Sequence, residues 1–216
     1  METQDRDREF ERIVDELVGR YSREEVAGVV ADSRSRLEET ATVGTYLPVL
    51  AQRFATERLR SLAKARGGPA KGVTHLLFVC NGNAGRSQMA AAFAAALGSE
   101  AVVASSAGLN PLQEVLPDVR AAMQEKGVGL PEAYPKPVTD DVFAAADVVI
   151  GLGVAEGDLP QARQRTLWDI PPVVDRGPAE VRAARDDIEA RVRSLLSDLA
   201  DDGTLNHSSG GGHASR

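Results

Sequence analysis

Apolar residues recur at helical spacing along the first third of the chain. Three successive runs place an apolar residue every three or four positions, the pattern of a helix with one buried face. The second run begins at Ser22-Arg23-Glu24-Glu25, where a hydroxyl is followed three residues later by a carboxylate, the form of a capping box. Pro48 suits the first turn of the third run, because the amide hydrogen that proline lacks has no partner there. The three runs carry Phe10, Ile13, Val14 and Leu17; Val26, Val29, Val30 and Leu37; and Leu47, Leu50, Phe54, Leu59 and Leu62. The pattern predicts a three-helix bundle over residues 1–68, which ends at a Gly-Gly-Pro linker.

The periodicity changes at residue 74. Leu76-Leu77-Phe78-Val79 is a short unbroken apolar run, typical of a strand buried on both faces. Three further strands are predicted, at 101–104, 147–151 and 165–168, and we expect Ser105-Ser106-Ala107-Gly108 to close the first of these three. Helices are predicted at 86–97, 116–126, 138–146 and 178–199. This alternation predicts an α/β domain over residues 74–200, a doubly wound parallel sheet with helices on both faces. The low-complexity tail, residues 201–216, is expected to be disordered.

Composition excludes several classes of protein. The chain has 216 residues, 43% apolar and 26% charged, with a formal net charge of −7, so a generic nucleic-acid binder is not expected. The longest apolar stretch with a helical pattern, 89–97, is far shorter than the roughly 20 residues that span a bilayer. The first fourteen residues are too charged for a signal peptide, so we expect a cytoplasmic protein. A single cysteine excludes an intrachain disulfide and a multi-cysteine metal site, and no metal is expected.

Cys80 lies at a position typical of a reactive cysteine, between a strand and a helix. It ends the first strand of the α/β domain, and Arg86-Ser87 follow six and seven residues later at a helix start. The intervening loop, rich in glycine and asparagine, can turn successive backbone amides toward one anion. The helix N-terminus adds partial positive charge, and the guanidinium of Arg86 suits two oxygens of a tetrahedral oxyanion. The residues expected to bind the oxyanion are Asn81, Gly82, Asn83, Ala84, Gly85 and Arg86.

In that field Cys80 should ionise readily and act as a nucleophile toward the central atom of the oxyanion. Ser87 can donate its hydroxyl to the sulfur, and the side-chain amide of Asn83 can fix the loop. The alternative is that Cys80 is only a small buried hydrophobic residue, which is what most free cysteines are.

The segment from Val79 to Ala90 resembles the low-molecular-weight protein tyrosine phosphatase family and the arsenate reductases built on the same fold. Ser105-Ser106-Ala107-Gly108 and Asp147-Val148-Val149-Ile150 match as well. The resemblance implies a four-stranded parallel sheet, a nucleophile at Cys80 and an oxyanion-binding Arg86. The sequence from Asn83 to Ala90 looks most like actinobacterial arsenate reductases that use mycothiol. The N-terminal segment is similar to a three-helix domain found on some of those proteins.

The chain departs from the phosphatases of this family at their general acid, an aspartate followed by proline. The corresponding loop is Trp168-Asp169-Ile170-Pro171-Pro172-Val173-Val174-Asp175, in which Pro172 stands where the aspartate is expected. Asp175 and Asp169 are the candidate replacements, although aspartate in a proline-rich loop is more often a turn former. Losing a general acid costs about 10²- to 10⁴-fold in rate, which disfavours phosphotyrosine hydrolysis.

Arsenate reduction instead needs a second thiol. The resemblance implies that thioredoxin-coupled reductases take it from further cysteines, which this chain lacks. We therefore expect an arsenate reductase with Cys80, Arg86, Ser87 and Asp175 as catalytic candidates and no bound cofactor. Mycothiol would be the co-substrate, recycled by a mycoredoxin or glutaredoxin-like partner. The alternatives are a low-molecular-weight protein tyrosine phosphatase and a non-catalytic oxyanion-binding regulator. We expect no nucleic-acid or membrane partner, and a homodimer through the N-terminal helices stays open.

Overall fold

The computed structural model describes residues 15, 21–39, 47–67, 72–159, 162 and 164–201. Two of the predicted N-terminal helices are present and pack together, α2 (Arg23–Glu38) and α3 (Leu47–Ala65). The predicted capping box forms, since Ser22 Oγ accepts from the Glu25 amide at 3.1 Å and the Glu25 carboxylate accepts from the Ser22 amide at 3.0 Å. The helix predicted at Phe10–Leu17 lies outside the described residues except for Asp15, as does nearly all of the tail.

The α/β prediction is confirmed. Strands β1 (Thr74–Cys80), β2 (Val102–Gly108), β3 (Val148–Leu152) and β4 (Arg165–Trp168) form one parallel sheet in the order β2-β1-β3-β4. The prediction that residues 105–108 end the strand as a turn is wrong. They continue β2, because pairing in register with residues 77–80 of β1 holds them extended despite two serines and a glycine.

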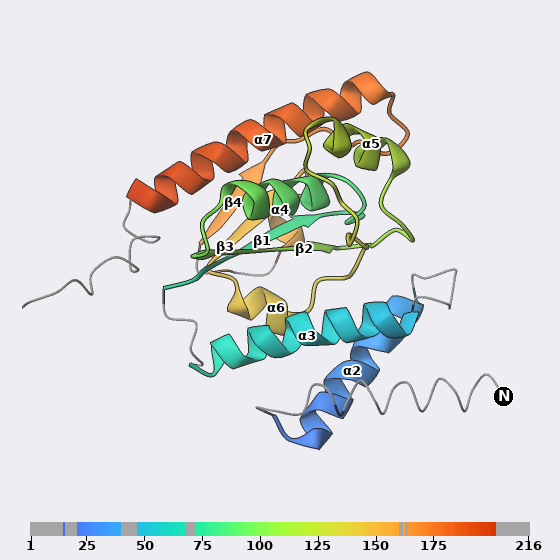
Figure 1. Cartoon of the computed structure of the whole chain (residues 1–216), viewed down its shortest axis with the longest axis vertical. Helices are drawn as coiled ribbons and strands as arrows, with labels where there is room; N and C mark the ends of the chain where they lie inside the picture. Colours follow the sequence, from blue (N-terminus) through green and yellow to red (C-terminus); the bar gives the residue numbers. More distant parts are fainter. Residues whose placement is uncertain are drawn as a thin grey trace, which may run out of the picture.

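Helices cover both faces of the sheet (Figure 1). One face carries α4 (Arg86–Leu97), α5 (Pro117–Glu125) and α7 (Pro178–Asp201), and the other carries the short α6 (Asp140–Ala145) with α3 beyond it. Side chains of β1 alternate between two apolar clusters, with Leu76 and Phe78 facing the α4 side and Leu77 and Val79 the α6 side. A 3₁₀ turn, η2 (Glu156–Asp158), follows β3. Among the described residues, no helix is both long and apolar enough to cross a membrane.

The N-terminal helices dock on the α6 side through buried charge. The Arg58 guanidinium of α3 donates to Asp141 of α6 at 2.8 Å and to Asp32 of α2 at 2.6 Å. Lys64, near the end of α3, pairs with Asp147 just before β3. Removing one partner of a buried pair is strongly destabilising, so these contacts fix how α2 and α3 sit on the α/β domain.

Candidate active site

The loop between β1 and α4 has its carbonyl groups tied to the neighbouring segment 109–116. Its backbone bonds run from Leu109 N to Cys80 O (3.1 Å), Asn110 N to Asn81 O (2.8 Å), Leu112 N to Gly82 O (2.9 Å) and Leu116 N to Ala84 O (3.0 Å). Within the described part of the chain, the amides of residues 81–86 have no acceptor. A row of free amides next to a helix N-terminus is an arrangement that can bind an anion. The binding of an oxyanion by residues 81–86 stays a prediction.

Asn83 sits at the centre of this loop, fully buried and in the left-handed region at φ 46°. Its Oδ1 accepts from the Lys136 amide at 2.9 Å and from Gln88 Nε2 at 3.1 Å, while its Nδ2 donates to Ser87 Oγ at 2.9 Å. Gly108 makes room for it, since a Cβ there would lie 2.9 Å from the Asn83 Cβ. Asparagine tolerates this backbone conformation better than most residues, and here its side chain uses both donor and acceptor.

The nucleophile candidate lies against a hydroxyl. Cys80 Sγ is 3.0 Å from Ser87 Oγ, and only 2% of Cys80 is exposed. Because Asn83 already donates to that hydroxyl oxygen, the hydroxyl hydrogen of Ser87 is free to point at the sulfur. Gly85, the N-cap of α4, has no side-chain capping bond, which leaves the first turn open to an anion. A Cβ at Gly85 would meet the Val173 side chain at 2.5 Å, so any other residue there would displace Val173 or the loop.

Arg86 is 9% exposed, and its position depends on two segments far away in the sequence. Its Nη1 donates to Ile170 O at 2.8 Å in the loop after β4. The guanidinium also lies against Gly153 after β3, where a Cβ would come within 1.9 Å of Nη1. Gly153 has φ 58°, so both the backbone and the close approach require glycine. Gly153 was not predicted from the sequence. The available signal was a glycine at the carboxyl end of a strand beside β1, where ligand sites form.

A cavity of about 370 Å³ opens beside Arg86, lined by Gly153 and Val154 and by the loop from Leu167 to Pro172. Asp169 is the carboxylate among these lining residues, and Pro172 also lines the cavity. Asp175 is exposed, adopts φ 55° and is not part of the lining. The structure thus places Asp169 in the lining of the cavity beside Arg86 and Asp175 in a turn. The catalytic role of Asp175 stays a prediction.

Gln88 is a second functional candidate that sequence reasoning did not single out. It is 5% exposed, and its Nε2 lies within hydrogen-bond distance of Asn83 O (3.0 Å), Asn83 Oδ1 (3.1 Å) and Tyr134 O (2.8 Å). Because Tyr134 lies 46 residues later, no local pattern could predict this contact. His75, by contrast, is the second residue of β1, at the opposite end of the strand from Cys80, and burial lowers its pKa. No group of three possible metal ligands occurs among the described residues.

Comparison with known proteins identifies the class. Residues 75–205 match the model of the low molecular weight phosphotyrosine protein phosphatases, and residues 7–63 match the protein-tyrosine-phosphatase-like N-terminal domain. The chain belongs to the low molecular weight phosphotyrosine protein phosphatase family and is an enzyme of that family.

Individual proteins similar to this chain include arsenate reductases and a phosphatase. The structure of Corynebacterium glutamicum thioredoxin-dependent arsenate reductase Cg_ArsC1' superposes with a TM-score of 0.81 at 32% identity, covering 94% of this chain and all of the other. Glutaredoxin arsenate reductase of Synechocystis is 29% identical over 129 residues, 58% of this chain and 98% of that protein. YwlE arginine phosphatase of Geobacillus stearothermophilus, at 24% identity over 66% of this chain and 99% of its own, with a TM-score of 0.55, shares the fold.

Proposed function

We propose that the protein is an arsenate reductase in which Cys80 attacks arsenate held by the amides of residues 81–86 and by Arg86. One observation carries the proposal: the chain combines a loop of free amides and Arg86 with a single cysteine. The register predicted from the sequence, in which Pro172 stands where a phosphatase of this family has its acid, supports it. The similarity to proteins named as arsenate reductases supports it.

In the first step the Cys80 thiolate forms a bond to arsenic while an arsenic–oxygen bond breaks. The departing oxygen leaves as water, and arsenic stays in the +5 state. Negative charge on the remaining oxygens is stabilised by the loop amides and the Arg86 fork, donors that are already in place before the reaction. Hydroxide is a poorer leaving group than a phenolate, so the departing oxygen must be protonated before it leaves. Arsenate carries hydroxyl protons of its own and can supply that proton, so the oxygen leaves as water and Pro172 is compatible with this step.

The second step needs a thiol from another molecule. An external thiolate attacks arsenic, the arsenic–sulfur bond to Cys80 breaks, and the Cys80 thiolate is regenerated. A further thiol, on a dithiol protein, then attacks the sulfur of the thiol–arsenate. A disulfide forms, and the electron pair of the arsenic–sulfur bond stays on arsenic, which becomes arsenite in the +3 state. Two external thiols are oxidised for each arsenate reduced.

We propose a small thiol of the mycothiol class as the first external thiol, with a mycoredoxin or glutaredoxin-like protein as the second. Cys80 is 2% exposed beneath its loop, which a slender thiol reaches more easily than the surface of a folded protein. The Corynebacterium relative is named for thioredoxin and the Synechocystis relative for glutaredoxin, so a protein dithiol acting directly is the competing source.

A second candidate function rests on Asp169. This exposed carboxylate lines the cavity next to Arg86, within the loop that carries the acid in phosphatases of the family. If the protein hydrolyses aryl phosphates, Asp169 is the general acid that the structure favours, and Asp169→Asn would reduce hydrolysis about 10²-fold or more.

The deciding experiment compares substrates and thiols in one preparation. Arsenite formation is measured with mycothiol plus mycoredoxin and, separately, with a thioredoxin system, beside hydrolysis of an aryl phosphate. We expect arsenite with mycothiol and weak ester hydrolysis. Arsenite formed with thioredoxin alone would show that a protein dithiol, and not mycothiol, is the external reductant, and would leave the arsenate reductase activity established. Ester hydrolysis without arsenite would establish the phosphatase, and no turnover of either substrate would favour the non-catalytic regulator.

A further inference from the structure

We propose that helix α3 of the N-terminal segment positions the nucleophile loop, with Glu57 and Lys136 as positioning residues. The proposal concerns the geometry around Cys80 and goes beyond the choice of substrate. It assigns the N-terminal helices a part in catalysis, although neither described helix contributes a residue to the oxyanion site.

A continuous series of polar contacts joins α3 to the sulfur. Glu57 Oε2 of α3 lies 3.3 Å from Lys136 Nζ, and the Lys136 amide donates to Asn83 Oδ1 at 2.9 Å. Asn83 Nδ2 donates to Ser87 Oγ at 2.9 Å, and Ser87 Oγ lies 3.0 Å from Cys80 Sγ. Every member from Lys136 onward is at least nine-tenths buried, so water does not loosen these bonds. A shift of Lys136 is therefore passed to the hydroxyl that faces the nucleophile.

Lys136 can transmit such a shift because its segment is stiff. It lies between Pro135 and Pro137, whose rings fix their own φ angles and restrict Tyr134 and Lys136, which precede them, to extended conformations. The Lys136 amide is the single backbone donor of the three residues, and Lys136 O accepts from Gly108 N at 2.9 Å. The side chain of Lys136 thus meets α3 while its backbone joins Asn83 to the end of β2.

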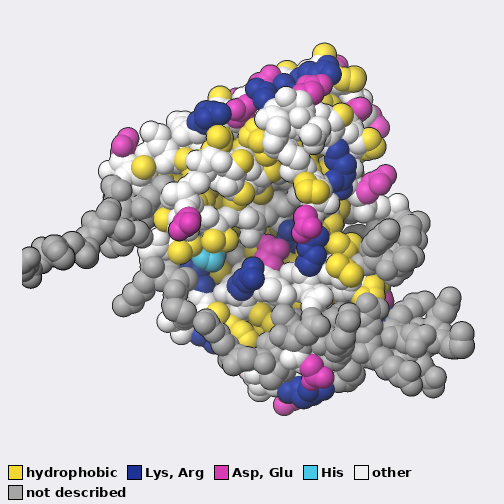
Figure 2. Space-filling view, viewed as in Figure 1, with side chains coloured by type: hydrophobic (Ala, Val, Ile, Leu, Met, Phe, Trp, Pro, Cys, Tyr) yellow, Lys and Arg dark blue, Asp and Glu magenta, His cyan; other side chains and the backbone are white. Residues whose placement is uncertain are grey.

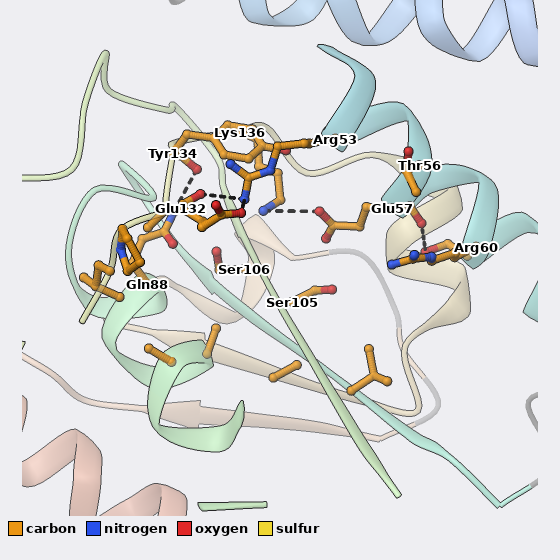
Figure 3. Close-up of a pocket in the computed structure, with 18 of the residues that line it drawn as sticks. Arg53, Thr56, Glu57, Arg60, Gln88, Ser105, Ser106, Glu132, Tyr134 and Lys136 are labelled. Atoms are coloured by element: carbon orange, nitrogen blue, oxygen red, sulfur yellow. Dashed lines mark hydrogen bonds and ion pairs between the residues drawn. The ribbon is translucent and has the colours of Figure 1, made fainter. Parts of the chain in front are cut away.

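A parallel contact reinforces the first (Figure 3). The Tyr134 ring contacts two cations, Arg53 of α3 at 5.2 Å and Lys136 at 4.9 Å from its centroid, while Tyr134 O accepts from Gln88 Nε2. Burial raises the pKa of Tyr134, so its ring stays neutral and presents an electron-rich face to both cations. Arg53 also donates to Glu132 O at 2.8 Å.

These contacts span a cavity rather than a continuous apolar core. The cavity, of about 880 Å³, lies between α3 and the edge strand β2, and Arg53, Glu57, Gln88, Tyr134 and Lys136 line it (Figure 3). Lys136 and Glu57 point toward one another across it. Tyr134 packs against the apolar cluster of α2 and α3, whereas Lys136 is joined to α3 across this space by the polar contact of its side chain with Glu57.

The test compares two Lys→Met variants of the full chain. Lys136→Met removes the ammonium and keeps the apolar stem; Lys64→Met is the matched control. Both lysines pair α3 with the catalytic domain and are similarly buried, at 10% and 16% side-chain exposure, but Lys64 meets Asp147, which has no bond to the nucleophile loop. The readouts are the second-order rate of Cys80 alkylation by iodoacetamide, the phosphate concentration that halves it, and kcat and KM for arsenate.

We expect Lys136→Met to lower the alkylation rate and kcat about 10-fold, because small displacements of a reacting group are costly, and Lys64→Met to leave both within about 2-fold. Glu57→Gln should lower the alkylation rate in the same direction as Lys136→Met, because it removes the carboxylate that pairs with the Lys136 ammonium. Its melting temperature should fall, since the buried ammonium loses its partner, and a cooperative thermal transition shows that the variant is folded. The double variant should be no slower than either single one.

Alkylation at the wild-type rate in folded Lys136→Met or Glu57→Gln would overturn the proposal. Equal losses in Lys64→Met would also overturn it, because they would show that any weakening of α3 docking has the same effect. If Lys136→Met does not fold, Glu57→Gln decides. The rate of Cys80 alkylation does not depend on which substrate the enzyme uses, whereas the turnover measurements rest on the proposed function. A failure of the positioning role of α3 can therefore be distinguished from a failure of the proposed arsenate reductase function.

Discussion

Arg86 illustrates how single residues far apart in the sequence set the geometry of this site. Its Nη1 donates to Ile170 O, and its guanidinium packs on Gly153. Gly153 follows β3, which pairs with β1, and Ile170 follows β4, which pairs with β3. Both therefore lie at the carboxyl edge of the parallel sheet, where such sheets form their ligand sites. The planar fork is therefore supported on one edge and can offer its remaining donors to an oxyanion.

Arg86→Lys keeps the charge but loses the fork. We expect oxyanion affinity to fall about 10- to 100-fold, because charge-assisted hydrogen bonds contribute about 1.5–3 kcal/mol. The measurement is the phosphate concentration that protects Cys80 from iodoacetamide. An unchanged protecting concentration would show that Arg86 does not bind the oxyanion.

Gly153→Ala should weaken oxyanion binding although the loop of residues 81–86 keeps its sequence. The new Cβ would lie 1.9 Å from Arg86 Nη1 and 2.6 Å from Ile170 O, at a backbone φ of 58°, so the guanidinium must move. We expect phosphate affinity to fall about 10-fold and the free energy of unfolding to drop about 1–3 kcal/mol. Gly157→Ala is the control, because nothing lies within 4 Å of its added Cβ. Wild-type phosphate protection in Gly153→Ala would contradict this account of Arg86.

Sequence reasoning located the parts of the site that are contiguous in the chain. Cys80, the loop amides, Arg86 and Ser87 lie within eight residues, so the strand, turn and helix signals placed them together. Gly153, Gln88 and Lys136 were missed, because their roles depend on tertiary contacts that leave no local pattern. The end of β2 was missed for a related reason: serine and glycine favour turns, but the ladder to β1 held residues 105–108 extended.

At the scale of elements, an exposed charge cluster joins α5 to α7 on the face opposite the N-terminal helices. Glu125 accepts from Arg182 and from Arg185, and the buried guanidinium of Arg185 also donates to Ala122 O at 2.8 Å. Hydrogen bonds from Arg182 and then Arg185 lower the pKa of Glu125 from 4.5 to about 2. This cluster holds the start of α7 against the end of α5.

The lowered pKa of Glu125 implies that the stability of the fold depends on pH. A carboxyl group whose pKa is depressed by folding stabilises the fold above its unfolded pKa near 4.5, and that contribution is lost as pH falls toward 2. Glu125→Gln should therefore lower the melting temperature at pH 7, and the difference from the wild type should shrink between pH 4.5 and pH 2. Glu114→Gln is the control, an exposed glutamate with no ion pair among the described residues. A difference independent of pH would contradict the assignment.

At the scale of the whole molecule, polar contacts join two parts that each have apolar clusters of their own, the catalytic domain and the pair of helices α2 and α3. The two apolar clusters around the sheet contain residues from Leu76 onward, whereas the clusters of α2 and α3 draw on one residue of the catalytic domain, the partly buried Tyr134. Figure 2 shows charged side chains where the N-terminal helices meet the catalytic domain. Such an arrangement lets the catalytic domain keep its core without the N-terminal helices.

Deletion of residues 1–68 should therefore leave a catalytic domain that unfolds in one cooperative thermal transition, as the linker prediction implies. Its melting temperature should fall, because Asp141 loses the Arg58 guanidinium and becomes an unpaired charge. Calorimetry of the truncated chain is the measurement. Loss of a cooperative transition would place the domain boundary elsewhere. Dimerisation through the N-terminal helices remains a prediction, which sedimentation of the full chain would test.

The most direct test of the account is a single turnover with a stoichiometric amount of arsenate. One cysteine cannot supply two thiols, so the wild-type protein alone should form no arsenite, and one equivalent should appear after mycothiol and mycoredoxin are added. Cys80→Ser should form none under either condition. Arsenite before any external thiol is added, or from Cys80→Ser, would contradict the central claim that Cys80 binds arsenic and that the reducing thiols come from outside the chain.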